Sequence, residues 1–217
     1  MTTAIIGTGN IGGQVARHLV AGGEPVVLAA RDESHATALA NELGPLASAA
    51  PVRQAIAEAE VVVLAVWLDT SKQLIAENGD LLHHKVIVDP SNPIQLDGKG
   101  GFGRTLPDGQ SAASVIARLL PADAPLVKAF GTLGAEALAS SANRRPRRAV
   151  LFYATDDEAA GATVERLITT AGFDAVKAGG LSDATRIEVA GDLHQYGGMK
   201  GNVVDADEAR VAVAVAA

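Results

Sequence analysis

Short runs of apolar residues alternate with longer amphipathic segments along the whole chain. The clearest run covers residues 61–66, six positions without a polar side chain, which is typical of a strand buried on both faces. Residues 3–7, 25–30 and 85–89 have the same character, and the segments after them show helical spacing of apolar positions. Strands that alternate with helices predict parallel βαβ units with right-handed crossovers.

The alternation continues in the second half of the chain, after a glycine-rich segment. Residues 98–109 carry five glycines and one proline, which predicts a mobile loop. Further strands are expected over residues 126–130, 149–154 and 173–178. The predicted helices cover residues 11–21, 33–43, 51–59, 70–78, 111–120, 134–141, 156–171 and 182–194. We expect the remaining residues at the C-terminus to fray.

This pattern predicts an α/β protein with a Rossmann-type, doubly wound, mostly parallel sheet and a small C-terminal α/β extension. We expect a dinucleotide-binding domain with its extension over residues 1–178 and a C-terminal helix and tail over residues 179–217, in one compact domain overall. A chain of 217 residues has the usual size for such a domain. Because only 3% of the residues are aromatic, the core must consist of Ala, Val, Leu and Ile.

The first apolar run leads directly into a glycine-rich turn. Gly7, Gly9 and Gly12 have the G-x-G-x-x-G spacing between a strand and a helix, the phosphate-binding signature of dinucleotide-binding folds. The first glycine permits the tight turn, the second admits the pyrophosphate, and the third lets the helix pack close to the strand. The N–H groups at the helix N-terminus then attract the phosphates.

The residues that follow the second strand bear on the choice between NAD and NADP. NAD-binding proteins place Asp or Glu there, where the carboxylate binds the ribose 2′-hydroxyl. Here the strand ends at Ala30, and the guanidinium of Arg31 can pair with the 2′-phosphate of NADP. Thr8 can donate its hydroxyl to the same phosphate. The sequence therefore favours NADP, whereas NAD is expected if Asp32 rather than Arg31 faces the ribose.

Charge and composition narrow the possible partners. Lys and Arg total 18 and Asp and Glu 25, a net charge of −7 that argues against a nucleic-acid or anionic-membrane binder. The chain has no cysteine, which excludes disulfides, thiolate catalysis and Cys-ligated zinc. The sequence has neither a basic leader nor an apolar run of bilayer length. We therefore expect a cytoplasmic protein with no membrane partner and no metal site.

Several other features have both a structural and a functional interpretation. Tyr196 and Lys200 have the Tyr-x-x-x-Lys spacing of short-chain dehydrogenases, but two glycines between them break the helix that this motif needs. Residues 144–148 hold four arginines, which form either a solvated loop or a dock for an anionic group. His83 and His84 are interpreted as a surface turn. His194 is either a proton donor or dimer contact, or a capping or packing residue. Trp67 is either a core residue or a member of the site.

On these segments the chain resembles the family of NADP-dependent reductases of the deazaflavin coenzyme F420, along nearly its whole length. Residues 7–12, 30–31, 61–67, 89–93, 127–133 and 178–182 carry the resemblance. It implies hydride transfer between nicotinamide C4 and deazaflavin C5. Such a reaction depends on the proximity and orientation of two rings, so no catalytic acid, base or nucleophile is expected.

The resemblance also implies a set of site residues at one edge of the sheet. The expected contacts of NADP(H) are Gly7, Thr8, Gly9, Asn10, Ile11, Gly12, Arg31, Val66, Trp67, Pro90 and Ala135. The expected acceptor pocket consists of Thr132, Leu133, Leu181 and Ser182. Gly131 stands where relatives place His or Asn beside the deazaflavin.

The expected partners are a small-molecule redox acceptor and a second copy of the chain in a homodimer. Coenzyme F420 is the first candidate for the acceptor. Two alternatives remain open from the sequence. One is an NADP(H)-dependent reductase of a small imine, carbonyl or quinone-like substrate, and the other is a non-catalytic NADP(H)-sensing protein.

Overall fold

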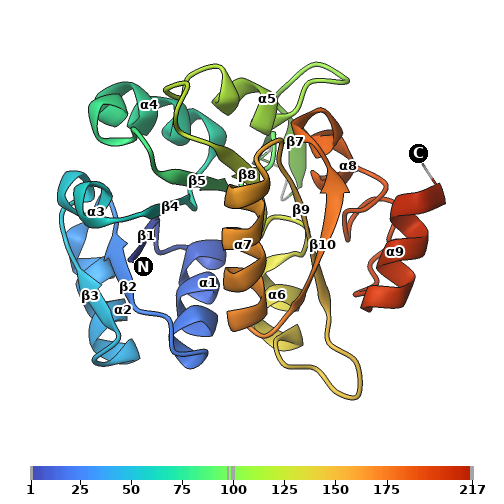
Figure 1. Cartoon of the computed structure of the whole chain (residues 1–217), viewed down its shortest axis with the longest axis horizontal. Coiled ribbons are helices and arrows are strands. Elements are labelled where there is room, and N and C mark those ends of the chain that lie inside the picture. The colour runs from blue at the N-terminus through green and yellow to red at the C-terminus, as the bar shows by residue number, and fades with distance from the viewer. Residues whose placement is uncertain (1, 97, 99–100, 216–217) are drawn as a thin grey trace.

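An eight-stranded sheet with helices on both faces organises the chain (Figure 1). The computed structural model describes residues 2–96, 98 and 101–215. The strands of the large sheet are β1 (Thr3–Ile6), β2 (Val26–Ala29), β3 (Ala47–Ala49), β4 (Val61–Leu64), β5 (Val86–Asp89), β8 (Leu126–Lys128), β9 (Val150–Ala154) and β10 (Asp174–Gly179). Their spatial order is β10-β9-β8-β5-β4-β1-β2-β3.

Six neighbouring strands, from β3 to β8, run parallel to one another. Their order corresponds to the 3-2-1-4-5-6 arrangement of dinucleotide-binding sheets. The chain reverses direction at β9, which meets β8 through one antiparallel pair, Lys128 with Ala154. Because β10 is again parallel to β9, the last two strands run against the other six. The predicted fold, a mostly parallel and doubly wound α/β sheet, is confirmed.

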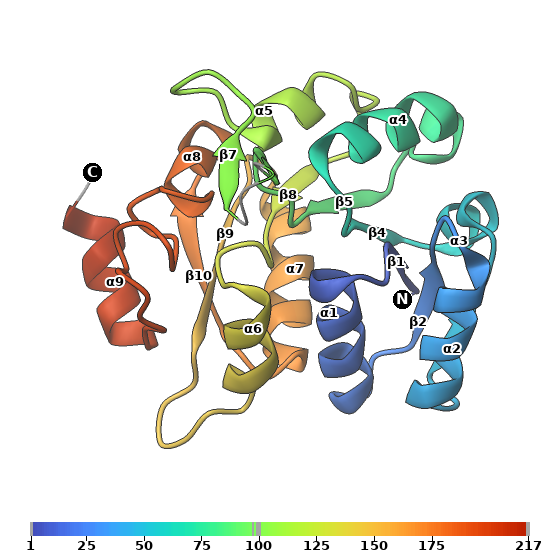
Figure 2. The ribbon, with the colours of Figure 1, turned by 180° about the vertical axis from the view of Figure 1, so that it is seen from behind.

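The helices lie on both faces of this sheet, as the two opposite views show (Figures 1 and 2). One face carries α1 (Asn10–Ala21), α2 (Glu33–Leu43), α6 (Ala135–Ser141) and α7 (Glu158–Thr170). The other face carries α3 (Val52–Glu58), α4 (Leu68–Asn78) and α5 (Ala112–Ala117), and next to β9 and β10 also α8 (Ala184–Ile187) and α9 (Ala206–Val215). None of the helices in the described ranges is long and apolar enough to cross a lipid bilayer.

The sandwich of helices explains why the central strands are apolar at every position. In β4, Val61 and Val63 belong to the core under α1, and Val62 and Leu64 belong to the core under α3 and α4. All four side chains are at most 1% exposed. Both faces of a parallel sheet must be covered in this way, because its crossover helices lie on both sides.

Three local predictions differ from the structure. The short edge strand β3 was not expected. Part of the predicted loop at residues 98–109 forms β7 (Phe102–Arg104), which pairs with β6 (Ile94–Leu96) in an antiparallel hairpin. Residues 99 and 100 of that loop lie outside the described residues. Residues 206–215 do not fray, because they form α9, which packs on β10 and buries Ala209 completely.

The helix predicted over residues 182–194 is also wrong in extent. The chain forms a 3₁₀ turn (Leu181–Asp183) and then α8, which ends at Ile187. Glycines permit close backbone contacts after this point. A Cβ atom at Gly191 would lie 2.3 Å from the carbonyl oxygen of Arg186, and one at Gly197 would lie 2.0 Å from that of Gly191. The segment therefore folds into successive turns instead of continuing the helix.

Candidate functional site

The carboxyl ends of five neighbouring strands, β2, β1, β4, β5 and β8, meet at one edge of the sheet. With adjacent strands about 4.8 Å apart, this edge extends over about 19 Å. The loops that follow these strands contain the predicted site residues Arg31, Gly7–Gly12, Val66, Trp67, Pro90, Thr132, Leu133 and Ala135. Ligands of open α/β sheets bind at such an edge, next to the point where the strand order reverses.

The glycine turn (Gly7–Gly12) has the geometry that its spacing predicts. Gly7 has a φ of +101°, which favours glycine, and its N–H donates to the carbonyl oxygen of Ala29 at 2.7 Å. A Cβ atom at Gly12 would lie 1.9 Å from the carbonyl oxygen of Gly7, so only glycine allows α1 to start this close to β1. A Cβ atom at Gly9 would meet no other atom within 4 Å. The backbone of Gly9 is thus open to an approaching phosphate.

The N-terminus of α1 offers donors next to this open position. Gly9 is the N-cap, and no side chain caps the helix. The first N–H groups of a helix have no intrahelical partner and carry a partial positive charge. Thr8 and Asn10 flank Gly9 at this point. The turn can therefore hold a pyrophosphate through backbone donors alone.

Arg31 and Asp32, which follow β2, differ in the contacts that their side chains make within the protein. Asp32 is the N-cap of α2 and accepts hydrogen bonds from the Ser34 hydroxyl at 2.6 Å and the Ser34 N–H at 3.0 Å. These two hydrogen bonds lower the pKa of Asp32, and the bond from the hydroxyl has the larger effect. Arg31 is exposed and forms no ion pair with the described residues. The free cation at this end of the edge is therefore Arg31.

Two residues after β4 line the middle of the edge. Val66 packs on the glycine turn, because its Cγ1 atom lies 2.7 Å from the position that a Cβ of Gly7 would take. Trp67 is the N-cap of α4, and its side chain is 52% exposed. The interpretation of Trp67 as a core residue is therefore wrong.

Beneath the far end of the edge lies a buried charged cluster. The Nζ atom of Lys128, at the end of β8, is 2.7 Å from Asp89 Oδ2 and 3.2 Å from Glu188 Oε1, and it also donates to the carbonyl oxygen of Ser91. All three charged side chains are at most 2% exposed. Burial by itself lowers the pKa of Lys128, but the charges and hydrogen bonds of Asp89 and Glu188 outweigh it and raise the pKa.

The backbone at Gly131 is fixed by this end of the sheet. Its carbonyl oxygen accepts hydrogen bonds from Asn92 Nδ2 at 3.0 Å and His194 Nε2 at 3.1 Å. A Cβ atom at Gly131 would lie 2.4 Å from the carbonyl oxygen of Pro90. No side chain fits at position 131 unless the backbone of Pro90 moves.

His194 is held as a neutral imidazole. Its Nδ1 atom accepts a hydrogen bond from the N–H of Tyr196 at 3.0 Å, so the proton must reside on Nε2, which donates to Gly131. Burial, assisted by the charge of Lys128, lowers the pKa of His194 to about 4, although the hydrogen bond to Gly131 opposes this shift. His194 therefore orders the backbone and is not a proton donor at neutral pH.

The structure does not bring the whole predicted acceptor pocket together. Leu181 lines a shallow pocket with Pro125 and Leu126, at the amino end of β8, and its N–H donates to Asp156 at 3.0 Å. Thr132 and Leu133 follow the carboxyl end of the same strand. Leu181 and its neighbour Ser182 therefore lie at the opposite edge from Thr132 and Leu133, because β9 and β10 run against the rest of the sheet.

A different segment stands beside Thr132 and Leu133. The N–H of Gln195 donates to the carbonyl oxygen of Thr132 at 3.0 Å, and Gln195 Oε1 accepts from the N–H of Gly134 at 2.8 Å. The sequence singled out Tyr196 and His194 only for other roles. The weak signal that could have found this segment is the cluster of glycines at residues 197–201, which indicates compact turns and not a helix.

One buried polar atom of the loop after β8 has no partner. Thr132 Oγ1 forms no hydrogen bond with the described residues, although Thr132 is only 2% exposed. A buried hydroxyl without a partner costs about 1–3 kcal/mol. A ligand group at this edge can satisfy it.

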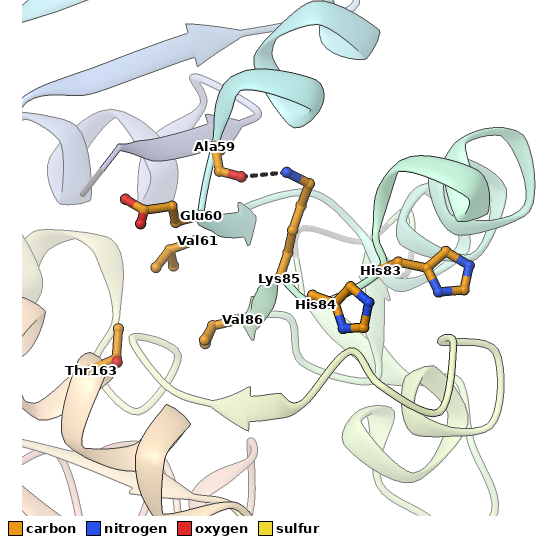
Figure 3. A pocket seen from close by; sticks show the side chains of 8 residues that line it. All are labelled: Ala59, Glu60, Val61, His83, His84, Lys85, Val86 and Thr163. Atoms are coloured by element: carbon orange, nitrogen blue, oxygen red, sulfur yellow. Dashed lines mark hydrogen bonds between the residues drawn. The ribbon is translucent and has the colours of Figure 1, made fainter.

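A second pocket lies, like the pocket beside Leu181, at the edge formed by the amino ends of the parallel strands, opposite the ligand edge (Figure 3). It has a volume of about 400 Å³ and is lined by residues 59–61, His83, His84, Lys85, Val86 and Thr163. Lys85 Nζ is bound to the carbonyl oxygen of Ala59 at 2.5 Å, as the close view shows. The two histidines contact the Asp123 carboxylate at 2.9 and 3.1 Å. Within the described ranges, no three His, Asp or Glu side chains form a group that could hold a metal.

The arginine-rich loop is largely occupied by contacts within the chain. Arg144 donates to the carbonyl oxygen of Val203 at 2.9 Å. Arg147 pairs with Asp205 and Asp207, each at 3.0 Å. These contacts tie the loop to the start of α9, so the interpretation as a dock for an anionic group has no support from Arg144 and Arg147.

Comparisons with known proteins agree with this geometry. Residues 2–93 match the family described as NADP oxidoreductase, coenzyme F420-dependent. A solved structure from Arthrobacter sp. FB24, described as an F420-dependent NADP-reductase, is 25% identical, covers 84% of this chain and 86% of its own, and superposes with a TM-score of 0.73. The resemblance to this family is confirmed.

Other relatives extend the picture. A hypothetical protein of Sinorhizobium meliloti is 28% identical, with a TM-score of 0.81 over 89% of this chain and 93% of that one. The metalloreductase STEAP3 of Rattus norvegicus is 30% identical over 85% of this chain, which spans only 35% of the relative. A reductive aminase of Aspergillus terreus, 19% identical over 84% of this chain and 56% of its own with a TM-score of 0.61, shares the fold.

The charged cluster leads to a prediction for Lys128→Met. Loss of the ammonium leaves Asp89 and Glu188 buried without a counter-charge, so the free energy of unfolding should fall by about 3–5 kcal/mol. Urea denaturation followed by circular dichroism measures this change. Lys177→Met is the control, because that lysine forms a more exposed ion pair with Glu158. Equal losses in the two variants would contradict the role of Lys128.

The lowered pKa of His194 predicts that the free energy of unfolding depends on pH. Its folded pKa of about 4 lies below the ordinary value of 6.5, so the unfolded chain binds more protons between these values. The stabilisation from neutral His194 is complete above pH 6.5 and is lost as pH falls toward 4, by about 3 kcal/mol.

Urea denaturation between pH 4 and 7 tests this dependence. His194→Gln should flatten the curve of unfolding free energy against pH in that window. His35→Gln, at an exposed position on α2, should leave the curve unchanged. A wild-type slope in His194→Gln would show that His194 does not titrate as the geometry indicates.

Proposed function

We propose that the protein transfers a hydride from NADPH to a planar redox acceptor, with the deazaflavin coenzyme F420 as the first candidate. The observation that carries the proposal is the continuous edge from Arg31 through the glycine turn to the loop Thr132–Ala135. The hydride takes two electrons from nicotinamide C4 to the acceptor, which gains its second hydrogen as a proton from solvent, and NADP⁺ remains.

The chain's residues fit the phosphate-bearing half of NADP. The open backbone at Gly9 and the uncapped N-terminus of α1 suit the pyrophosphate. Arg31 suits the 2′-phosphate, because its guanidinium is exposed and can form two parallel hydrogen bonds. Asp32 does not compete for the ribose while it caps α2. This arrangement supports NADP over NAD.

The other half of the edge suits the meeting of two rings. Val66 and Trp67 lie on one side, Pro90 supports the middle, and Thr132 and Leu133 lie on the other side. The unpaired hydroxyl of Thr132 can bind the nicotinamide carboxamide. The buried imidazole of His194 is neutral, and both of its nitrogen atoms form hydrogen bonds with the backbone. These residues can orient two rings without a catalytic acid or base, which is the chief requirement of a direct hydride transfer.

Stopped-flow absorbance with NADPH and oxidised coenzyme F420 tests the proposal, with NADH in parallel. Fast reduction of the deazaflavin by NADPH is the expected result. Binding of NADPH, seen as quenching of Trp67 fluorescence, without reduction of the deazaflavin would exclude this acceptor. Turnover of an imine, carbonyl or quinone panel in that case would identify the alternative class of acceptor.

Arg31→Ala should weaken NADPH binding by about 1.5–3 kcal/mol, because a charge-assisted hydrogen bond to the 2′-phosphate is lost. Binding of NADH should change little. Fluorescence titration of Trp67 measures both affinities. Arg118→Ala removes an exposed arginine from the end of α5 and serves as the control. A selective effect of Asp32→Ala in place of Arg31→Ala would overturn the assignment.

A further inference from the structure

The segment from His194 to Gly201 forms a fixed wall beside the loop that follows β8. His194 donates to Gly131, and Gln195 binds both Thr132 and Gly134, at 2.8–3.1 Å. Gln195 is also bound at the other end of the segment, since its Nε2 donates to the carbonyl oxygen of Gly201 at 3.1 Å. The residue between these anchors, Tyr196, is therefore held at a defined place on the ligand edge.

The side chain of Tyr196 lies directly over Gly134, the N-cap of α6. A Cβ atom at Gly134 would lie 2.3 Å from Tyr196 Oη and 2.7 Å from Cε2. The rest of the ring is open, because Tyr196 is 62% exposed. The absence of a side chain at Gly134 thus makes room for an aromatic ring that presents a free surface next to Leu133 and Ala135.

Aromatic residues are few in this chain, which has one Trp, two Tyr and four Phe in 217 residues. Among the described residues, the exposed ones are Trp67, Phe102 and Tyr196. Trp67 follows β4 and Tyr196 contacts the loop after β8, so these two rings lie on the same edge of the sheet. Phe102 belongs to the hairpin that follows β5. Solvent-exposed aromatic surface grouped around a ligand edge indicates a binding role.

We propose that Tyr196 is the residue against which the ring of the hydride acceptor packs, and that Gly134 is required to let the tyrosine ring occupy that place. This inference rests on the proposed function, because it assigns a contact to the acceptor of that reaction. Offset packing of two rings requires the aromatic face and not the hydroxyl. Tyr196 is thereby a binding and specificity residue and takes no part in the hydride transfer itself.

The short-chain dehydrogenase motif does not account for Tyr196. Lys200 has a φ of +52° and follows two glycines in a series of turns, so the two side chains do not share a helix face. The ring of Tyr196 is also not a core residue, since its only ring neighbour in the described residues is His194, at 5.9 Å between centroids. Neither alternative explains an anchored and exposed tyrosine.

Three variants test the proposal in steady-state reduction of coenzyme F420 by NADPH. Tyr196→Ala should raise the KM for the deazaflavin about ten-fold, the effect of losing one aromatic contact. Tyr196→Phe keeps the ring and should stay within about two-fold of the wild type. Gly134→Ala should resemble Tyr196→Ala, because its φ of −63° and ψ of 157° accept alanine while the new methyl group displaces the ring.

Two controls separate this proposal from the proposed function. NADPH affinity, measured through Trp67 fluorescence, should be the same in all three variants. Val211→Ala removes an exposed apolar side chain from α9 and should change neither constant. A wild-type KM in Tyr196→Ala, or an equal rise in Tyr196→Phe, would overturn the assignment of Tyr196 while the reductase activity stands. A wild-type protein that binds NADPH but neither binds nor reduces the deazaflavin would exclude this acceptor and overturn the assignment of Tyr196 to its ring.

Discussion

The buried ion cluster of Lys128 with Asp89 and Glu188 is the interaction on which the arrangement of the ligand edge depends. It joins the carboxyl ends of β5 and β8 to the residue after α8, three elements that are distant in the sequence. Buried charges are costly unless they are paired, so the three side chains cannot separate without a large loss of stability. The loops that start at Pro90 and Ala129 are therefore fixed at their origin.

This rigidity also explains why residue 131 is a glycine, for which the sequence alone gives no reason. Gly131 stands where relatives carry a side chain beside the acceptor, which the sequence alone presents as a missing contact. In the structure the backbone of Pro90 occupies the space that a Cβ would need, and Asn92 and His194 hold the carbonyl oxygen. Position 131 therefore offers no side chain to the edge, whereas the ring of Tyr196 extends over Gly134, three residues further along the chain.

The parts of the fold that were predicted correctly depend on local physics. The apolar strand at residues 61–66 must be buried on both faces, and the glycine turn follows from steric limits at Gly7 and Gly12. These signals place the phosphate end of the site. The direction of β9 is not a local property, because the strand pattern is the same whether β9 runs with β8 or against it. That single reversal moved Leu181 and Ser182 to the opposite edge.

The wall at residues 194–201 could not be predicted for a related reason. Its position depends on hydrogen bonds between Gln195 and the loop after β8, more than 60 residues away in the sequence, and no periodic pattern records such pairs. What the sequence shows is a cluster of glycines around Tyr196, compatible with any compact turn.

The two ends of the edge differ in physical character, because one is positively charged and the other is aromatic and apolar. At one end, Arg31 and the N-terminus of α1 supply positive charge that favours phosphate binding, in a chain whose net charge is −7. From the middle of the edge toward the other end, Trp67 and Tyr196 offer exposed aromatic surface, and the nearby imidazole of His194 is neutral. In the proposed reaction, charge positions the cofactor's phosphates and flat apolar surfaces orient the two rings. A hydride moves between stacked rings without help from a titrating side chain, so orientation of the rings is the requirement that this edge has to meet.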